Sequence, residues 1–144
     1  MNPTMRRRCN LLGFTLIEVI IAIAIVGLLA SIAIPSYQEV VRRGYRAECR
    51  SGLAAAMQEQ ERSFVRNSTY STTLAKSFSG DSASTSACTL AAAACATGQI
   101  AICVRITATT AKSDTKCNTM TLDSTNTTTA FDSSATDQQA ACWK

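Results

Sequence analysis

Residues 13–35 read GFTLIEVIIAIAIVGLLASIAIP, and this stretch decides the fold. The 21 residues from Phe14 to Ile34 are apolar except for Thr15, Glu18, Gly27 and Ser31. At about 1.5 Å per residue, a helix of this length crosses the ~30 Å hydrocarbon core of a bilayer. The sequence therefore predicts a membrane-spanning helix, which Pro35 should kink or shift in register rather than end, because proline lacks a backbone donor.

The residues ahead of this stretch are basic. Arg6, Arg7 and Arg8 stand together, and subtracting them lowers the formal net charge from +4 to +1. A basic cluster followed by an apolar segment is an export and orientation signal whose basic end stays in the cytoplasm. We therefore interpret residues 1–13, which end in Leu11-Leu12-Gly13, as a leader peptide.

Glu18 is the most informative residue of the apolar segment. A carboxylate inside a membrane costs about 2.5 to 3.5 kcal/mol on insertion scales and needs a partner. Cleavage after Gly13 would give Phe14 a free amino group, and the amine of one subunit could then meet Glu18 of a neighbour. Such a pair would fix the axial register of parallel helices, since only one offset neutralises both charges.

An ordinary secretory signal is the alternative. In that interpretation Arg6 to Arg8 form the basic region, and Ser31-Ile32-Ala33 is a small-residue cleavage site. The mature chain would then be a soluble periplasmic or secreted binding domain without the apolar helix. A charged Glu18 inside the apolar region argues against this alternative.

The motif Gly13-Phe14-Thr15-Leu16-Ile17-Glu18, followed by an apolar run and Pro35, resembles the class III signal of type IV pilins and pseudopilins. The resemblance implies that a prepilin peptidase cuts after Gly13 and N-methylates Phe14, that Glu18 acts in assembly, and that Pro35 marks the helix kink. It also implies a single pass through the bacterial inner membrane with a periplasmic head. Assembly with other pilin subunits into an extracellular helical filament would follow.

Beyond Pro35 the pattern becomes amphipathic. Apolar residues from Tyr37 to Phe64 recur at steps of three, four or seven, with arginine and glutamate among them. We expect this helix, residues 36–66, to continue the apolar half, residues 14–35, with Gly44 and Gly52 as soft points.

The rest of the chain predicts a small β head, residues 67–144. Asn67 to Ser86 is rich in Ser and Thr and is expected to be a connecting loop. Short strands are expected at residues 87–92, 100–107, 119–123 and 127–131. The fold class is therefore α+β, the type IV pilin fold, in which the second half of the helix packs on a small antiparallel sheet.

Composition argues against catalysis. The chain has no histidine, so the commonest metal ligand and the commonest general base are both missing. The cysteines have neither the CxxC spacing nor the histidine partners of a zinc site. We expect a structural protein with no enzymatic activity, no metal and no cofactor.

Cysteines compensate for a thin core. Cys9 lies in the leader, and six remain after cleavage, which points to an oxidising compartment. Six cysteines permit 15 connectivities, so their pairing stays open from the residues alone. The six are Cys49, Cys88, Cys95, Cys103, Cys117 and Cys142.

A second resemblance narrows the pairing. The segment from Cys117 to Asp123, with Cys142-Trp143 later, looks like the C-terminal region of certain minor pilins, which implies a Cys117–Cys142 bridge. Asn118 and Asn126 stand where that family usually has glycine, and asparagine tolerates positive φ. Cys95 and Cys103 bracket a Thr97-Gly98 turn and could clip a hairpin. Cys49 and Cys88 remain by elimination.

Two functions share the N-terminal signal. The first is a minor pilin of a type IV pilus, which would support twitching motility, adhesion or DNA uptake. The second is a pseudopilin of a type II secretion system, whose major subunits often use a calcium site in place of a C-terminal disulfide.

Nucleic acid is a less favoured partner. A basic patch for DNA could be built from scattered residues, but such charges usually just solvate a surface. Tyr37, Tyr45 and Phe64 could form a stacking platform, although a stripe of this kind is more often a packing face. The basic residues in question are Arg62, Arg66, Arg105, Lys112, Lys116 and Lys144.

Overall fold

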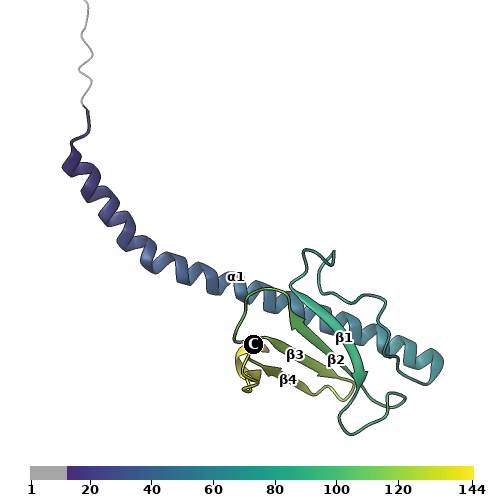
Figure 1. Ribbon diagram of the computed structural model, residues 1–144. Helices are drawn as coiled ribbons and strands as arrows, with labels where there is room; N and C mark the ends of the chain where they lie inside the picture. The colour runs from purple at the N-terminus through teal and green to yellow at the C-terminus, as the bar shows by residue number, and fades with distance from the viewer. Residues whose placement is uncertain (1–12) are drawn as a thin grey trace, which may run out of the picture. The chain divides into compact units, whose positions relative to one another are not determined.

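The computed structural model describes residues 13–144, so the predicted leader, apart from Gly13, lies outside the described residues. The described chain contains one long helix, a four-stranded antiparallel sheet and a short C-terminal helix (Figure 1). It divides into two compact units at the boundary between Gln38 and Glu39. The predicted α+β class is confirmed.

Helix α1 runs without a break from Leu16 to Asn67. The Thr15 hydroxyl accepts a hydrogen bond from the backbone N–H of Glu18 at 3.3 Å, which satisfies one of the free donors at the helix start. Pro35 lies inside the helix and does not end it, as expected. Ser68 follows the last turn with a φ of 56°, and its N–H donates to the Phe64 carbonyl oxygen at 2.7 Å.

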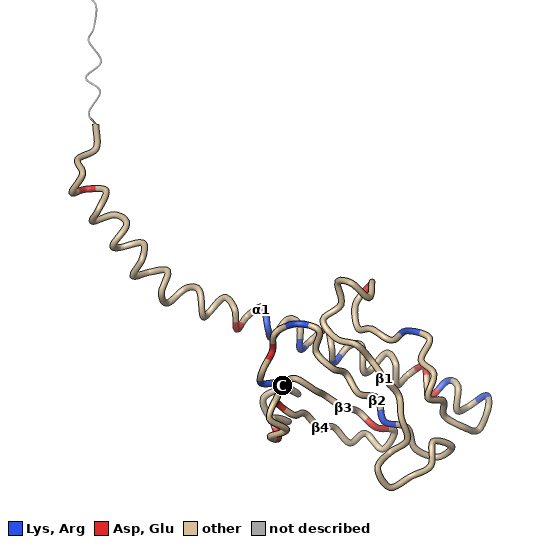
Figure 2. The backbone as a smooth tube through the Cα atoms, viewed as in Figure 1, with Lys and Arg blue, Asp and Glu red and all other residues tan. Residues whose placement is uncertain are grey.

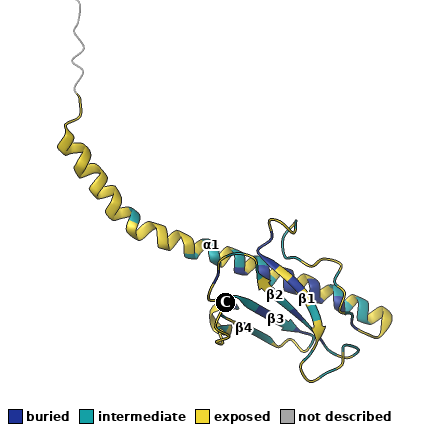
Figure 3. Ribbon diagram, in the orientation of Figure 1, coloured by how far each residue is buried: buried dark blue, intermediate teal, exposed yellow. Residues whose placement is uncertain are grey.

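The first unit exposes its apolar side chains. Every residue from 13 to 38 except Ala30 is exposed, as Figure 3 shows along the first half of α1. An 18-residue window of this helix has a mean hydropathy of 2.8 with none of its residues buried, so it is long and apolar enough to cross a membrane. An exposed apolar surface of this size requires a membrane or a partner to cover it.

The second unit contains a β-meander. Its strands are β1 (Cys88–Ala94), β2 (Val104–Thr110), β3 (Thr119–Asp123) and β4 (Thr128–Phe131), and they pair in sequence order, all antiparallel.

One expected strand was wrong in detail, and one helix was not expected. Strand β2 begins at Val104, because the N–H groups of Ile102 and Cys103 both donate to the Gln99 carbonyl oxygen and fold residues 100–103 into a turn. Helix α2 (Gln139–Cys142) was not anticipated from the sequence.

The core lies between the second half of α1 and one face of the sheet. Strand β2 alternates buried Val104, Ile106 and Ala108 with more exposed neighbours, as a half-buried strand should. Leu53, from the facing side of α1, is fully buried. The other buried apolar residues are Cys49, Ala56, Met57, Tyr70, Ala87, Cys88, Leu90, Cys117, Met120, Ala130 and Cys142.

Gly52 is a close-packing position and not the soft point that the sequence suggested. A Cβ atom built on Gly52 would lie 2.8 Å from the Cβ and 2.9 Å from the Cα of Ser79, in the loop before β1. Gly44 has no atom within 4 Å of such a Cβ. The loop therefore rests directly on the helix backbone at Gly52.

We predict that Gly52→Ala destabilises the protein by about 1–3 kcal/mol, because the new methyl group must displace the backbone of Ser79. In a domain of this size that corresponds to a Tm lower by roughly 5–15 °C. Thermal unfolding of the detergent-solubilised protein, followed by circular dichroism, measures the change. Gly44→Ala is the matched control and should leave Tm unchanged or slightly higher, since alanine favours helix. Equal Tm values for the two variants would contradict the packing argument.

Candidate functional site

The N-terminal residues that the sequence analysis singled out are all accessible. Gly13 and Phe14 precede α1, and the Phe14 side chain is 83% exposed. Glu18 lies in the first turn of the helix, also exposed, and among residues 13–144 it makes no salt bridge. Glu18 is thus an exposed carboxylate on an otherwise apolar helix surface.

Three disulfides hold the second unit together. They join Cys49 to Cys88, Cys95 to Cys103 and Cys117 to Cys142, with Cα–Cα distances of 5.5, 5.5 and 5.8 Å. These are the same pairs that the sequence analysis proposed. The sequence separations of 39, 8 and 25 residues correspond to about 4, 2.5 and 3.5 kcal/mol in the chain-entropy account of cross-linking.

Two of the bridges connect different parts of the head, and Cys95–Cys103 closes the β1–β2 connection. Cys49–Cys88 ties α1 to the first strand, and Cys117–Cys142 ties the β2–β3 connection to α2. Asn118 and Asn126 stand where related minor pilins usually have glycine, so both were candidates for a positive φ. Asn126 has a φ of 64°, whereas Asn118 is not among the described residues with positive φ.

A buried ion pair links α1 to the β2–β3 connection. Arg46 Nε and Nη2 donate to the two carboxylate oxygens of Asp114 at 2.6 and 3.0 Å, and both side chains are buried. Arg46 Nη1 also lies 3.3 Å from Glu39 Oε1. The bidentate geometry satisfies the carboxylate while positioning the guanidinium.

The same contacts set the protonation of Asp114. Burial by itself raises the pKa of the carboxyl, but hydrogen bonds and charge from Arg46, with the N–H groups of Cys117 and Lys116, outweigh burial and hold this pKa below its usual range. The pKa of Arg46 is raised by its hydrogen bonds to Asp114. Both groups are therefore charged at neutral pH.

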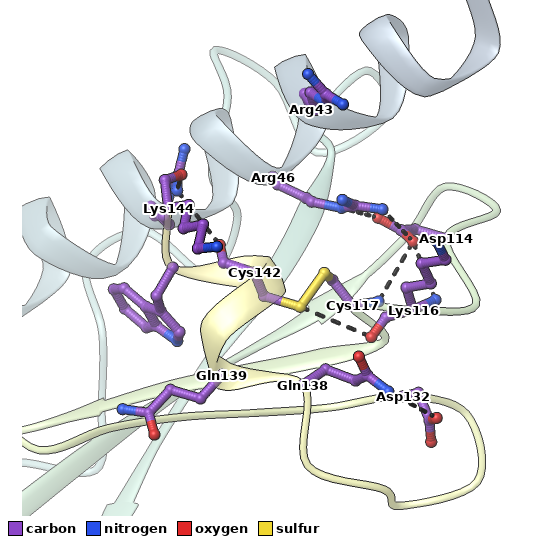
Figure 4. The surroundings of a disulfide bond; sticks show 12 residues. Arg43, Arg46, Asp114, Lys116, Cys117, Asp132, Gln138, Gln139, Cys142 and Lys144 are labelled. Atoms are coloured by element: carbon purple, nitrogen blue, oxygen red, sulfur yellow. Dashed lines mark hydrogen bonds and ion pairs between the residues drawn. A yellow bond between two sulfur atoms is a disulfide. The ribbon is translucent and has the colours of Figure 1, made fainter. Parts of the chain in front are cut away.

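A pocket lies beside this pair and the Cys117–Cys142 disulfide. Its volume is about 540 Å³, and we call it the basic pocket because five of its lining residues are cations. Figure 4 shows Arg43 and Arg46 on α1, with Lys116 and Lys144 on the segments that the disulfide joins. The lining residues are Glu39, Arg43, Arg46, Arg50, Lys116, Ala141, Cys142 and Lys144.

The other basic residues named in the sequence analysis lie elsewhere. Arg62 and Arg66 line a separate pocket with Glu59 and Glu61 near the end of α1. Arg105, on β2, lies 3.9 Å from Asp123 Oδ2. Figure 2 shows both blue and red positions along the second half of α1, so the charges there are mixed.

Sequence reasoning did not find the basic pocket. It named Lys116 and Lys144 but not Arg43, Arg46 and Arg50, and nothing in the sequence relates positions near 46 to positions 116 and 144. A partial signal existed, because residues 43, 46 and 50 recur at helical spacing on one face of α1.

Two family models match the chain. One, described as type IV minor pilin ComP, DNA uptake sequence receptor, matches residues 35–121, more than half of the chain. This chain belongs to that family of type IV pilins. The other, the prokaryotic N-terminal methylation motif, matches residues 11–34 of this pilin.

Individual relatives match the pilin over part of its length. It is 41% identical over 59 residues to the type IV major pilin protein PilA of Myxococcus xanthus, covering 41% of this chain and 27% of that protein. It is 58% identical over 36 residues to fimbrial protein EcpC of Eikenella corrodens, covering 25% of this chain and 24% of that protein. For the type IV major alpha-pilin of Moraxella bovis the identity is 49% over 43 residues, covering 30% and 27%. The chain thus spans about a quarter of the length of these relatives.

Family membership makes this protein a pilin subunit, and the pilins form a structural rather than an enzymatic family. In the part of the chain that the structure describes, no group of three or more His, Cys, Asp or Glu residues could hold a metal ion.

We predict that acid weakens the head through Asp114. Because its folded-state pKa lies below the unfolded value of about 3.9, its stabilisation is complete above that value and is lost as pH falls through the folded-state pKa. Asp114→Asn should lower the free energy of unfolding at pH 7 by about 3 kcal/mol. This is the lower end of the range for breaking a buried ion pair, because Glu39 still contacts Arg46 in the variant.

The measurement is Tm as a function of pH from about 7 to 3. Asp114→Asn should show a smaller loss of Tm across this range than the wild type. Asp81→Asn, in an exposed loop, is the control and should follow the wild-type curve. An acid dependence of Asp114→Asn equal to that of the wild type would refute the role of this pair.

Proposed function

We propose that this pilin is a minor subunit of a type IV pilus and acts there as a receptor for DNA during uptake. The observation that carries the proposal is the match of residues 35–121 to the family described as a DNA uptake sequence receptor. This range includes the second half of α1 and the strands β1 and β2, so it lies mainly in the head. The scattered basic residues alone made nucleic acid a less favoured partner, and the match to this family is the reason for now proposing DNA as the partner.

Maturation and location follow from the N-terminal segment. Prepilin peptidase removes residues 1–13 by cutting after Gly13 and methylates Phe14, which the match of the methylation motif to residues 11–34 supports. Residues 14–35 then hold the subunit in the inner membrane and later in the filament core. Residues 36–66 carry the head, residues 67–144, on the periplasmic side and afterwards on the pilus surface.

Glu18 sets the register during assembly. Its carboxylate stands on an exposed, apolar helix and meets the N-methylated amine of Phe14 in a neighbouring subunit. Both charges then leave the lipid or the filament core as a neutral pair, which lowers the cost of burying either one.

A type IV pilus is favoured over a type II secretion filament. The Cys117–Cys142 bridge resembles the C-terminal bridge of minor pilins, whereas major pseudopilins often hold calcium there. The bridge also joins α2 covalently to the β2–β3 connection, so a disulfide holds this region where a calcium ion would in a major pseudopilin.

For Glu18→Ala we expect normal processing but incorporation into filaments at least tenfold below wild type, because the neighbouring amine is left unpaired. Immunoblots of membrane and sheared-filament fractions measure both. Gly13→Arg is the control for the cleavage step and should stay uncut in the membrane. Wild-type incorporation of Glu18→Ala would exclude the pairing, and normal processing of Gly13→Arg would exclude the cleavage site.

The receptor role predicts that deleting the gene abolishes uptake of labelled DNA while filaments persist. Quantitative mass spectrometry of sheared filaments should find this chain at a few per cent of the major subunit or less. Loss of all filaments on deletion would indicate a major subunit instead. Unchanged DNA uptake in a strain that lacks the chain would refute the receptor role.

A further inference from the structure

The three disulfides of the head differ in how well the protein shields them. Cys95 and Cys103 are half-buried, and they close the connection between β1 and β2, which extends beyond the end of the strands (Figure 1). The four cysteines of the other two bridges are only 0 to 3% exposed. A thiolate in solution therefore reaches the Cys95–Cys103 bridge more readily than the other two. The four buried cysteines are Cys49, Cys88, Cys117 and Cys142.

The residue inside the closed loop that faces the bridge is a glycine. A Cβ atom built on Gly98 would lie 3.2 Å from the Cβ of Cys103 and 3.9 Å from the Cβ of Cys95. Any side chain at this position would therefore lie against the bridge. The neighbouring residues Thr97 and Gln99 are exposed. Glycine thus leaves the bridge without a covering side chain from the middle of its own loop.

A serine hydroxyl is held against one of the two sulfurs of this bridge. Ser124 follows β3, and its Oγ donates to Cys103 Sγ at 3.4 Å. The start of β2 fixes this serine, because the Ser124 N–H donates to the Val104 carbonyl oxygen at 2.9 Å and the Val104 N–H donates to Ser124 Oγ at 3.4 Å. When a disulfide is cleaved, the departing sulfur carries negative charge, which a hydroxyl donor stabilises. The hydrogen bond therefore favours Cys103 as the leaving group.

Opening this bridge would change only the connection that it closes. The pairing of β1 with β2 extends to Ala94 and Val104, so the sheet is hydrogen-bonded up to the bridge itself. The bridge spans a sequence separation of 8 residues, against 25 and 39 for the other two, so it restricts the unfolded chain least. Its loss therefore leaves the sheet and both buried bridges in place.

We propose that the Cys95–Cys103 bridge is a thiol–disulfide exchange site whose partner is a dithiol. One thiolate of the partner attacks Cys95 Sγ, the Cys95–Cys103 bond breaks, and Cys103 leaves as a thiolate that takes up a proton from water. The second thiolate of the partner attacks the partner's own sulfur in the mixed disulfide and releases Cys95. Two electrons pass to the head, and the partner becomes a disulfide. Reduction frees the β1–β2 connection, the reverse reaction closes it, and neither step depends on the proposed receptor function.

The first test treats the full processed chain in detergent with dithiothreitol, a small dithiol. Samples are quenched over time with N-ethylmaleimide, and the labelled cysteines are mapped by mass spectrometry. We expect Cys95 and Cys103 to be labelled together, about tenfold faster than the four buried cysteines. Far-ultraviolet circular dichroism should stay unchanged while only this pair is labelled. If either buried bridge opened first or at the same rate, the exchange site would be wrong.

The second test uses glutathione, a monothiol, to identify the sulfur that is attacked. After the same quench we expect glutathione on Cys95 and maleimide on Cys103. Ser124→Ala should slow the opening about threefold and weaken this preference, because the leaving sulfur loses its hydrogen bond. Ser134→Ala, in an exposed turn, is the matched control and should react as the wild type does. Equal glutathione on both cysteines of the wild type would overturn the directing role of Ser124.

A third test compares variants that lack one bridge. Cys95→Ser/Cys103→Ser should fold with the other two bridges formed and should lower Tm less than Cys117→Ser/Cys142→Ser, whose bridge spans a longer loop. Thermal unfolding measures both Tm values, and mass spectrometry after maleimide treatment counts the remaining bridges. A larger loss of Tm for Cys95→Ser/Cys103→Ser would mean that this bridge supports the fold, and the exchange site would be refuted.

Discussion

The exposed apolar half of α1 is the constraint on which the rest of this pilin depends. Residues 13–38 are exposed except for Ala30, and α1 contains an 18-residue window with a mean hydropathy of 2.8 and no buried residue. Such a surface is stable only in lipid or against other copies of the same helix. In the proposed assembly the helix moves from the first environment to the second, and the proposed pairing of Glu18 with a cation at one axial position would make that step specific.

The head is a separate compact unit, so its fold depends on contacts among residues 39–144. Its core consists of one helix face and a four-stranded sheet built largely from Ala, Thr and a few larger residues such as Leu53, Ile106 and Met120. Three disulfides and the Arg46–Asp114 pair add the cross-links that such a core needs. The head can therefore present long Ser- and Thr-rich loops without losing its fold.

The same cross-links shape the basic pocket. The Cys117–Cys142 bridge and the Arg46–Asp114 pair hold the β2–β3 connection and the chain end against α1, and the basic pocket forms where these three segments meet. Because Arg46 is neutralised by Asp114, it acts as a structural support of the head.

The sequence by itself determined the long helix, its apolar first half and the α+β class, because these features depend on local periodicity. It left the cysteine pairing open, and a family resemblance narrowed that pairing before the structure gave the three bridges. Tertiary structure alone decided that Gly52 packs on Ser79, that β2 starts at Val104, and that Arg43 and Arg50 lie beside Lys116 and Lys144. The reason is physical: the pocket cations of α1 lie about 70 to 100 residues from Lys116 and Lys144, and Gly52 lies 27 residues from Ser79, so no local pattern encodes these distances. The start of β2 depends instead on two hydrogen bonds to the Gln99 carbonyl oxygen that the residue pattern did not reveal.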